Sequence, residues 1–320
     1  MNSEVASLQR VLFSTAPKKQ KEHSKPPAGD GPLVKFVFLM GVEGTGHHLY
    51  RSMYLESPSQ KRLKNYGIQT HDVQNLSKAL YYQVNPSEGL FSAPCSQSGT
   101  VVNGTELTQK LIDMLRVMDS KIKNVTTALQ RGEQLFIPLN AHGEQEFEAG
   151  MMSYPNFKGP CRHLQYPDIN ALYKACHEAG VWCEHILIYR EAHEIIKSTT
   201  INRNFSLTQL QQIKTMTTML DVIHGQLLDN PDRVAACWDY GSAVGGGIED
   251  VGALLGWEHS NFTSFYSRIY RAKPPLSNEE KLKIVPKELQ VYMDSMVHAN
   301  EKVWTTCQTQ LSLKQQPKSF

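Results

Sequence analysis

The sequence has almost no excess charge and no apolar run long enough to cross a membrane. Its 320 residues carry a formal net charge of +2, with acidic and basic side chains interspersed. Such a balance provides no global field for a nucleic acid, so no nucleic-acid partner is expected and any anion site must be local. A membrane-spanning helix needs about 18 or more consecutive apolar residues. The longest apolar stretch, residues 33–40, is far shorter and predicts a buried strand.

The six cysteines include no CxxC pair, so the sequence predicts neither a zinc site nor any other metal site. Sequons for N-glycosylation exceed the roughly two that composition would give by chance. The excess favours the secretory pathway and the Golgi lumen, where some cysteines could form disulfides. A cytoplasmic protein with chance sequons is the alternative. The sequons begin at Asn75, Asn103, Asn124, Asn204 and Asn261.

The first 32 residues differ in composition from the rest of the chain. They are rich in lysine, proline and glycine, which is typical of a flexible segment or linker. We therefore expect a flexible segment over residues 1–32, one domain over residues 33–310 and a tail over residues 311–320.

Apolar, β-branched runs alternate with segments of helical periodicity along this domain. The alternation predicts an α/β fold with a central parallel sheet and helices on both faces. Pro138 predicts that its strand lies at an edge or that pairing ends there. Residues 85–104 predict a loop. Strands are predicted at 34–40, 134–139, 185–189 and 233–238, and helices at 45–55, 71–84, 106–129, 168–179, 191–200, 207–228, 248–255 and 288–304.

A glycine-rich loop, Gly41-Val42-Glu43-Gly44-Thr45-Gly46-His47-His48, joins the first predicted strand to the first predicted helix. Glycines let backbone N–H groups turn towards an anion, and the start of the helix adds partial positive charge. The spacing fits the GxxxxG frame of a P-loop, but His47 and His48 replace the lysine and the Ser/Thr metal ligand. A magnesium-dependent kinase or ATPase needs both, so the loop predicts a phosphate site that works without metal.

A second motif follows the third predicted strand. Arg190 ends that strand, and Ser198 lies eight residues further on, within the next predicted helix. From these two positions a planar guanidinium and a hydroxyl can converge on one anion.

These two motifs, in this order, resemble those of the P-loop sulfotransferase superfamily, over about residues 33–305. Its members bind 3′-phosphoadenosine 5′-phosphosulfate (PAPS), with the 5′-phosphosulfate on the loop and the 3′-phosphate on the arginine and serine. The resemblance implies a P-loop three-layer sandwich and an enzyme that transfers a sulfuryl group to a hydroxyl or amine of a small molecule or glycan. It implies PAPS contacts from Gly44, Thr45, Gly46, His47, His48, Arg190 and Ser198, and a basic cluster adds Arg271.

The same resemblance suggests which residues take part in transfer. In the family's cytosolic members a histidine base follows the second of these strands, and His142 holds that place here, with Glu144 and Glu146 as rivals. His47 or His48 would stabilise the bridging oxygen in place of the family's lysine. Because histidine is only partly charged near neutral pH, that role is expected to be sensitive to pH.

Two alternatives remain open at this stage. A P-loop kinase or NTPase would require magnesium and a strand that ends in aspartate, which only Trp238-Asp239 provides. A non-catalytic nucleotide-binding relative would keep the fold without turnover, and the missing lysine is compatible with that.

Overall fold

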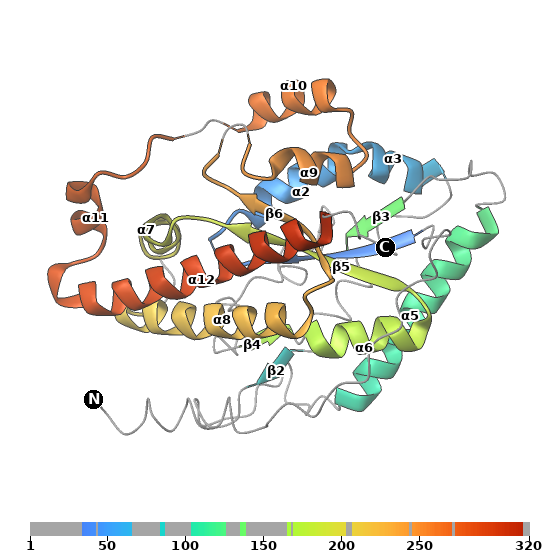
Figure 1. Ribbon diagram of the computed structural model, residues 1–320, viewed down its shortest axis with the longest axis horizontal. Helices are drawn as coiled ribbons and strands as arrows, with labels where there is room; N and C mark the ends of the chain where they lie inside the picture. Colours follow the sequence, from blue (N-terminus) through green and yellow to red (C-terminus); the bar gives the residue numbers. More distant parts are fainter. Residues whose placement is uncertain are drawn as a thin grey trace.

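The computed structural model describes residues 34–42, 44–65, 84–86, 104–125, 135–138, 165–167, 169–202, 207–242, 245–270 and 273–315. Within these ranges the chain is a mixed α/β protein built on a four-stranded parallel sheet of order β3-β1-β5-β6 (Figure 1). The predicted parallel sheet is thereby confirmed. Its strands are β1 (Val34–Met40), β3 (Leu135–Pro138), β5 (Trp182–Tyr189) and β6 (Val234–Asp239). A separate antiparallel pair joins β2 (Val84–Pro86) to β4 (Gln165–Pro167).

The two central strands are deeply buried. In β1, residues 36–40 are at most 2% exposed, and in β5 the six residues between Trp182 and Tyr189 are all buried. Burial on both faces suits the apolar run of β1, whereas β5 also buries Glu184 and His185. Pro138 lies on β3, which pairs only with β1 in the described sheet, so the prediction of an edge strand is confirmed.

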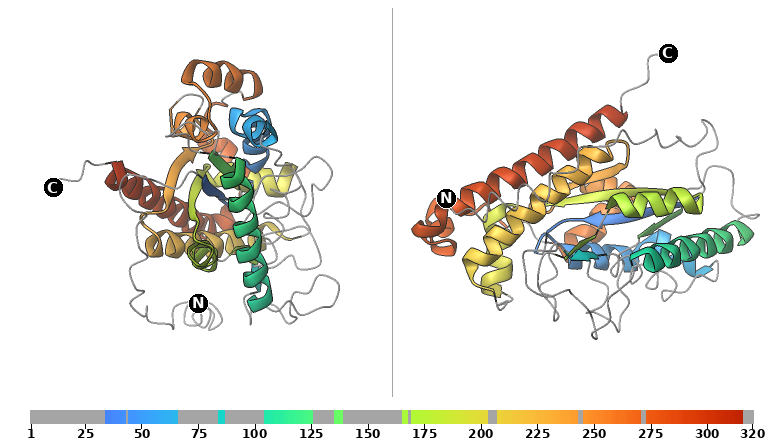
Figure 2. Two further views of the ribbon diagram at one scale, coloured as in Figure 1. Left: turned by 90° about the vertical axis from the view of Figure 1, so that its right-hand side faces the viewer. Right: turned by 90° about the horizontal axis from the view of Figure 1, so that it is seen from below.

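Helices lie on both sides of the sheet. Figure 1 shows α2, α3, α9 and α10 above it and α6 and α8 below it, while α12 passes in front of it along α8. The turned view in Figure 2 keeps the upper and lower groups apart. No helix in the described ranges is long and apolar enough to span a bilayer. The helices are α2 (His47–Glu56), α3 (Pro58–Asn65), α5 (Gly104–Val125), α6 (Ile169–Ala179), α7 (Ala192–Ile196), α8 (Gln209–Asp229), α9 (Ile248–Leu254), α10 (His259–Ile269), α11 (Asn278–Ile284) and α12 (Gln290–Gln315), with a π-helix η3 (Lys197–Asn202) and a 3-10 turn η4 (Lys287–Leu289).

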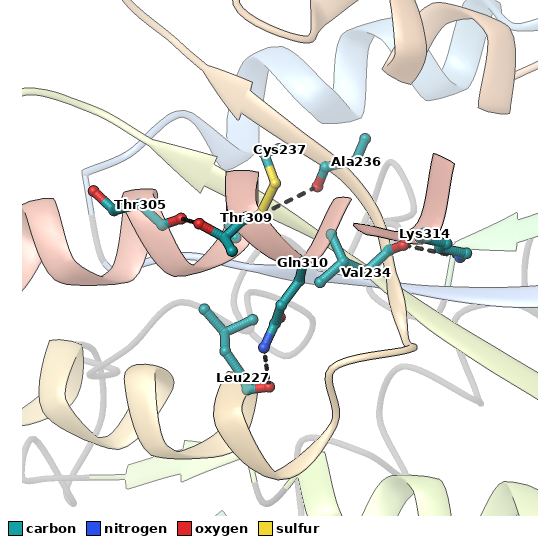
Figure 3. The surroundings of a disulfide bond; sticks show 9 residues. Leu227, Val234, Ala236, Cys237, Thr305, Thr309, Gln310 and Lys314 are labelled. Carbon is teal, nitrogen blue, oxygen red and sulfur yellow. Dashed lines mark hydrogen bonds between the residues drawn. A yellow bond between two sulfur atoms is a disulfide. The ribbon is translucent and has the colours of Figure 1, made fainter. Parts of the chain in front are cut away.

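Helix α12 runs to Gln315, so the predictions that it ends at Trp304 and that a tail begins at 311 are wrong. Its last turns are held by contacts with distant elements (Figure 3). Gln310 donates from Nε2 to the carbonyl of Leu227 on α8 at 2.7 Å. Lys314 donates from Nζ to the carbonyl of Val234 on β6 at 2.9 Å. These interactions stabilise a helical end that local sequence does not specify.

Among the residues that the structure describes, two disulfides fasten helices to the sheet. Cys176–Cys183 joins α6 to β5, and Cys237–Cys307 joins β6 to α12. All four side chains are at most 3% exposed. The predicted possibility that some cysteines pair is therefore realised, and the pairs lie inside the core.

Some predictions fall on residues outside the described ranges. These are the flexible segment 1–32 and nearly all of the predicted helix 71–84, of which only Val84 is described, as the start of β2. Within the predicted loop 85–104, Asn85 and Pro86 belong to that strand and Gly104 begins α5.

Candidate functional site

The candidate site lies at the carboxyl edge of the sheet, where the strand order reverses. From β1 the chain reaches β3 on one side and then returns to β5 on the other side of β1. In open α/β sheets, ligands bind outside the carboxyl ends of the strands at such a point. The glycine loop follows β1 and Arg190 follows β5, so both flank this reversal, while Tyr240 follows β6.

The loop closes a tight turn between β1 and α2. Gly44 and Gly46 have φ of 94° and 130°, values that L side chains rarely adopt. Thr45 donates from its backbone N–H and from its hydroxyl to the carbonyl of Val42, at 3.1 and 2.8 Å, and is 1% exposed. In the structure Thr45 therefore secures the turn, and the PAPS contact expected of it remains a prediction.

Gly44 is the point at which the two sequence motifs meet. A Cβ placed on Gly44 would lie 3.4 Å from Cβ of Ser198, 3.2 Å from Cγ2 of Thr199 and 3.2 Å from the carbonyl of Ile195. Ser198 is 8% exposed. The absence of a side chain at Gly44 thus lets the loop backbone pack directly on the helix that carries Ser198.

Arg190 bonds to the same glycine. Its Nη1 donates to the carbonyl of Gly44 at 2.7 Å, and its Nη2 donates to Oε2 of Glu194 at 2.9 Å. The side chains of Arg190 and Glu194 are 15% and 18% exposed. The two motifs therefore come together at Gly44. Whether Arg190 and Ser198 share one anion stays a prediction.

The turn after β5 is stabilised by a capped helix. Glu191 caps α7 by accepting from the N–H of Glu194 at 3.0 Å, and its carboxylate also lies 2.8 Å from Nδ1 of His193 and 3.4 Å from Nζ of Lys281 on α11. Burial alone would raise the pKa of Glu191, but the bonds with His193 and Glu194 and the charge of Lys281 together hold it below its ordinary value. The charged cap fixes the start of α7 and so the direction of Glu194.

Helix α7 continues as the π-helix η3, which carries Ser198. Thr199 and Thr200 donate their hydroxyls back to the carbonyls of Ile195 and Ile196, at 3.2 and 2.6 Å. Hydroxyl back-bonding competes with the regular helical ladder. The prediction of a single helix over 191–200 thus missed a π-helix, a feature common at functional sites.

Tyr240 is a site residue to which the sequence analysis gave no role. A Cβ placed on Gly46 would lie 2.2 Å from the ring carbon Cδ2 of Tyr240. The guanidinium carbon of Arg190 lies 4.8 Å from the centroid of the same ring. The backbone N–H of Tyr240 donates to the carbonyl of Tyr189 at 2.8 Å, and Tyr270 donates its hydroxyl to the carbonyl of Tyr240 at 2.6 Å. The ring therefore covers Gly46 and supports Arg190. Its place two residues after the end of a predicted strand was the available signal.

The two histidines of the loop differ in burial. His47 is 5% exposed, and its Cε1 would lie 3.4 Å from a Cβ on Gly41, so its ring packs against the beginning of the loop. His48 is only half-buried. Of the two, His48 is the more accessible to a ligand on the loop.

The remaining expected site residues, His142, Glu144, Glu146 and Arg271, lie outside the described residues. Within the described ranges, no three histidine, cysteine or carboxylate side chains are grouped so that they could hold a metal ion.

Comparisons with known proteins give no relative. The chain matches no protein-family model, no curated protein and no solved structure.

Proposed function

We propose that this protein is a sulfotransferase that takes a sulfuryl group from PAPS and transfers it to a hydroxyl or amine of a small-molecule or glycan acceptor. The observation that carries the proposal is the meeting at Gly44 of three segments far apart in sequence: the glycine loop, Arg190 and the helix of Ser198. A phosphate loop and a second anion-binding pair at one edge suit a nucleotide with two separate phosphates.

The fold agrees with this proposal. A P-loop three-layer sandwich has a parallel sheet, a glycine loop after its first strand and helices on both faces, and the first strand here lies beside the reversal of strand order. The residues present fit the nucleotide in one specific respect. Positive φ at Gly44 and Gly46 gives the loop a backbone that side-chain-bearing residues would resist.

Different residues of the chain would bind the two phosphate groups and neutralise charge during transfer. Backbone N–H groups of Gly44 and of residues 46–48 would hold the 5′-phosphosulfate, since that of Thr45 donates to Val42, and Arg190 with Ser198 would hold the 3′-phosphate. PAPS supplies an activated sulfuryl group, whose transfer, like that of a phosphoryl group, depends on alignment and charge neutralisation. His48, the more open histidine, would neutralise charge on the bridging oxygen. Arg271 would add positive charge.

The acceptor side of the reaction needs a general base. His142 is proposed as the residue that removes the acceptor's proton, with Glu144 or Glu146 as the substitute. A base of this kind contributes about 10²–10⁴-fold to the rate.

The kinase or NTPase alternative gains nothing from Asp239, the aspartate that ends β6. One of its carboxylate oxygens accepts from the N–H of Gly241 and the other from the hydroxyl of Ser242, each at 2.9 Å. These bonds give Asp239 a structural role in the turn that leads away from the sheet.

Nucleotide selectivity tests the proposal. Because a charge-assisted contact contributes roughly 1.5–3 kcal/mol, the protein should bind 3′,5′-diphosphoadenosine at least about tenfold more tightly than adenosine 5′-phosphate without added magnesium. Arg190→Ala should remove most of this preference and Ser198→Ala a smaller part. Calorimetric titration of both nucleotides measures the ratio. Equal affinities in the wild-type protein would sink the proposal and favour the kinase or NTPase alternative. Selective binding without sulfate transfer from labelled PAPS to a panel of sugars, phenols and steroids would favour the non-catalytic alternative.

We also propose that the protein resides in the lumen of the secretory pathway, in the Golgi, as a glycoprotein. Two buried disulfides suit an oxidising compartment. The sequon at Asn261 lies on α10, at the top of Figure 1, and both Asn261 and Thr263 are exposed. An exposed sequon in a lumenal protein is an acceptor for an N-linked glycan.

Asn261 should therefore carry a glycan when the full chain is produced in eukaryotic cells. Enzymatic deglycosylation in heavy-oxygen water should convert Asn261 to labelled aspartate in the corresponding peptide, detected by mass spectrometry. Thr263→Ser keeps the sequon and should keep the label, whereas Thr263→Ala should abolish it. An unlabelled Asn261 in the wild-type protein would count against a lumenal site of residence.

A further inference from the structure

Arg190 is already bonded to the protein at both terminal nitrogens. Its Nη1 donates to the carbonyl of Gly44 at 2.7 Å and its Nη2 to the carboxylate of Glu194 at 2.9 Å. The ring of Tyr240 lies 4.8 Å from the guanidinium carbon. Because both charged side chains are less than one-fifth exposed, water screens this ion pair less than it would a pair on the surface.

We propose that Glu194 is a specificity-determining residue that occupies, on Arg190, the place that the 3′-phosphate of the nucleotide would take. The inference rests on the proposed function, because it assumes that Arg190 reads that phosphate. Two-point recognition of a phosphate uses two N–H groups of the guanidinium that point the same way. An incoming phosphate therefore competes with Glu194 for Nη2. The two anions would also repel each other, because both would lie beside the same nitrogen.

The position of Glu194 is fixed by its helix. Glu194 lies one turn into α7, whose first turn is capped by Glu191 through the N–H of Glu194 itself. Its carboxylate consequently points at the end of β5 without any ligand. Ligands that lack a phosphate at the 3′ position leave this pair undisturbed, whereas a 3′-phosphate must replace a carboxylate that is already in place.

A second cation can receive the displaced carboxylate. Nζ of Lys197, in the first turn of η3, lies 4.0 Å from the other oxygen of Glu194, and the Lys197 side chain is 37% exposed. A small rotation of Glu194 towards Lys197 would release Nη2 while keeping the carboxylate paired. Because Glu194 would exchange one cation for another, displacing it costs less free energy than leaving its carboxylate unpaired.

The experiment compares two nucleotides in three variants. Glu194→Gln keeps a side chain of the same shape that can still accept from Arg190, but removes the negative charge. Its affinity for 3′,5′-diphosphoadenosine should rise about three- to tenfold, because the 3′-phosphate no longer competes with a charged, partly buried carboxylate for Arg190. Its affinity for adenosine 5′-phosphate should change less than about twofold. Glu194→Asp, which keeps the charge but shortens the reach, should give an intermediate ratio.

The matched control is Glu279→Gln on α11. It removes the same charge from a side chain that is 80% exposed and pairs with Lys283 at 2.7 Å, so it should leave the ratio of affinities unchanged. A purely structural role for Glu194 would lower melting temperature and affinity for both nucleotides together, and that outcome would overturn the inference. An unchanged ratio in Glu194→Gln, with the wild-type preference intact, would also overturn it while the proposed function stands. If the wild-type protein bound neither nucleotide, the proposed function itself would fail.

Discussion

Replacing the Cys237–Cys307 disulfide by two alanines should lower the free energy of unfolding by about 4 kcal/mol. The bond joins β6 to α12 over a sequence separation of 70 residues. A crosslink of that span removes many conformations from the unfolded chain, and its loss restores them. The other contacts that hold α12 to the sheet and to α8 remain in the variant, so the same fold is expected.

The second disulfide is the matched control. Cys176–Cys183 is equally buried, but its separation is only 7 residues. Since the crosslink entropy grows with the logarithm of loop length, the tenfold ratio of 70 to 7 corresponds to 1.5RT ln 10, or about 2 kcal/mol. The Cys176→Ala/Cys183→Ala variant should thus lose about 2 kcal/mol less stability. Urea unfolding of both double variants under non-reducing conditions measures the difference, and equal losses would contradict the entropic account.

Elements with strong local signals were predictable from the sequence. The strand over 34–40 matches β1 residue for residue, because an apolar β-branched run ends at a glycine. The helix that stops at Gly180, whose φ is 72°, was also predicted at its true end. Strand β5 begins three residues earlier than predicted, at Trp182, because burial against β1 includes residues whose own character is mixed.

Elements that depend on tertiary contacts were missed. Helices α3, α10 and α11 were not predicted. Helix α3 buries only one large apolar side chain, Leu63, and α11 is mainly charged. For α11 a readable signal existed, since Ser277 and Glu280 form a capping box. The last turns of α12 had no such signal, because the residues that hold them lie on β6 and α8.

The candidate site was predictable in its parts rather than in its contacts. The sequence indicated a glycine loop after the first strand and an anion-binding pair, Arg190 and Ser198, after the third. In the structure these segments meet at Gly44. The roles of Glu194 and Tyr240 depend on how a guanidinium is oriented between three elements, which no local pattern encodes.

Substituting alanine for Gly46 should reduce both stability and nucleotide binding. Gly46 has a φ of 130°, and a Cβ there would lie 2.2 and 2.6 Å from two ring carbons of Tyr240. Backbone strain and overpacking each cost roughly 1–3 kcal/mol, so the variant should lose at least about 2 kcal/mol of unfolding free energy. Because Gly46 immediately precedes α2, relief of the clash would move the N–H groups that are proposed to hold the 5′-phosphosulfate.

A second substitution separates the two causes. In a Tyr240→Ala background the clash is gone but the unfavourable φ remains, so Gly46→Ala should cost about 1–3 kcal/mol less there than in the wild-type protein. Gly225→Ala is the control, because a Cβ at Gly225 in α8 meets nothing within 4 Å and should be neutral or stabilising. Urea unfolding measures the stability of each variant. Calorimetric titration with 3′,5′-diphosphoadenosine should show binding weakened by more than about tenfold in the Gly46→Ala single variant. A Gly46→Ala protein that bound this nucleotide as tightly as wild type would mean that the loop after β1 is not where the 5′-phosphate lies.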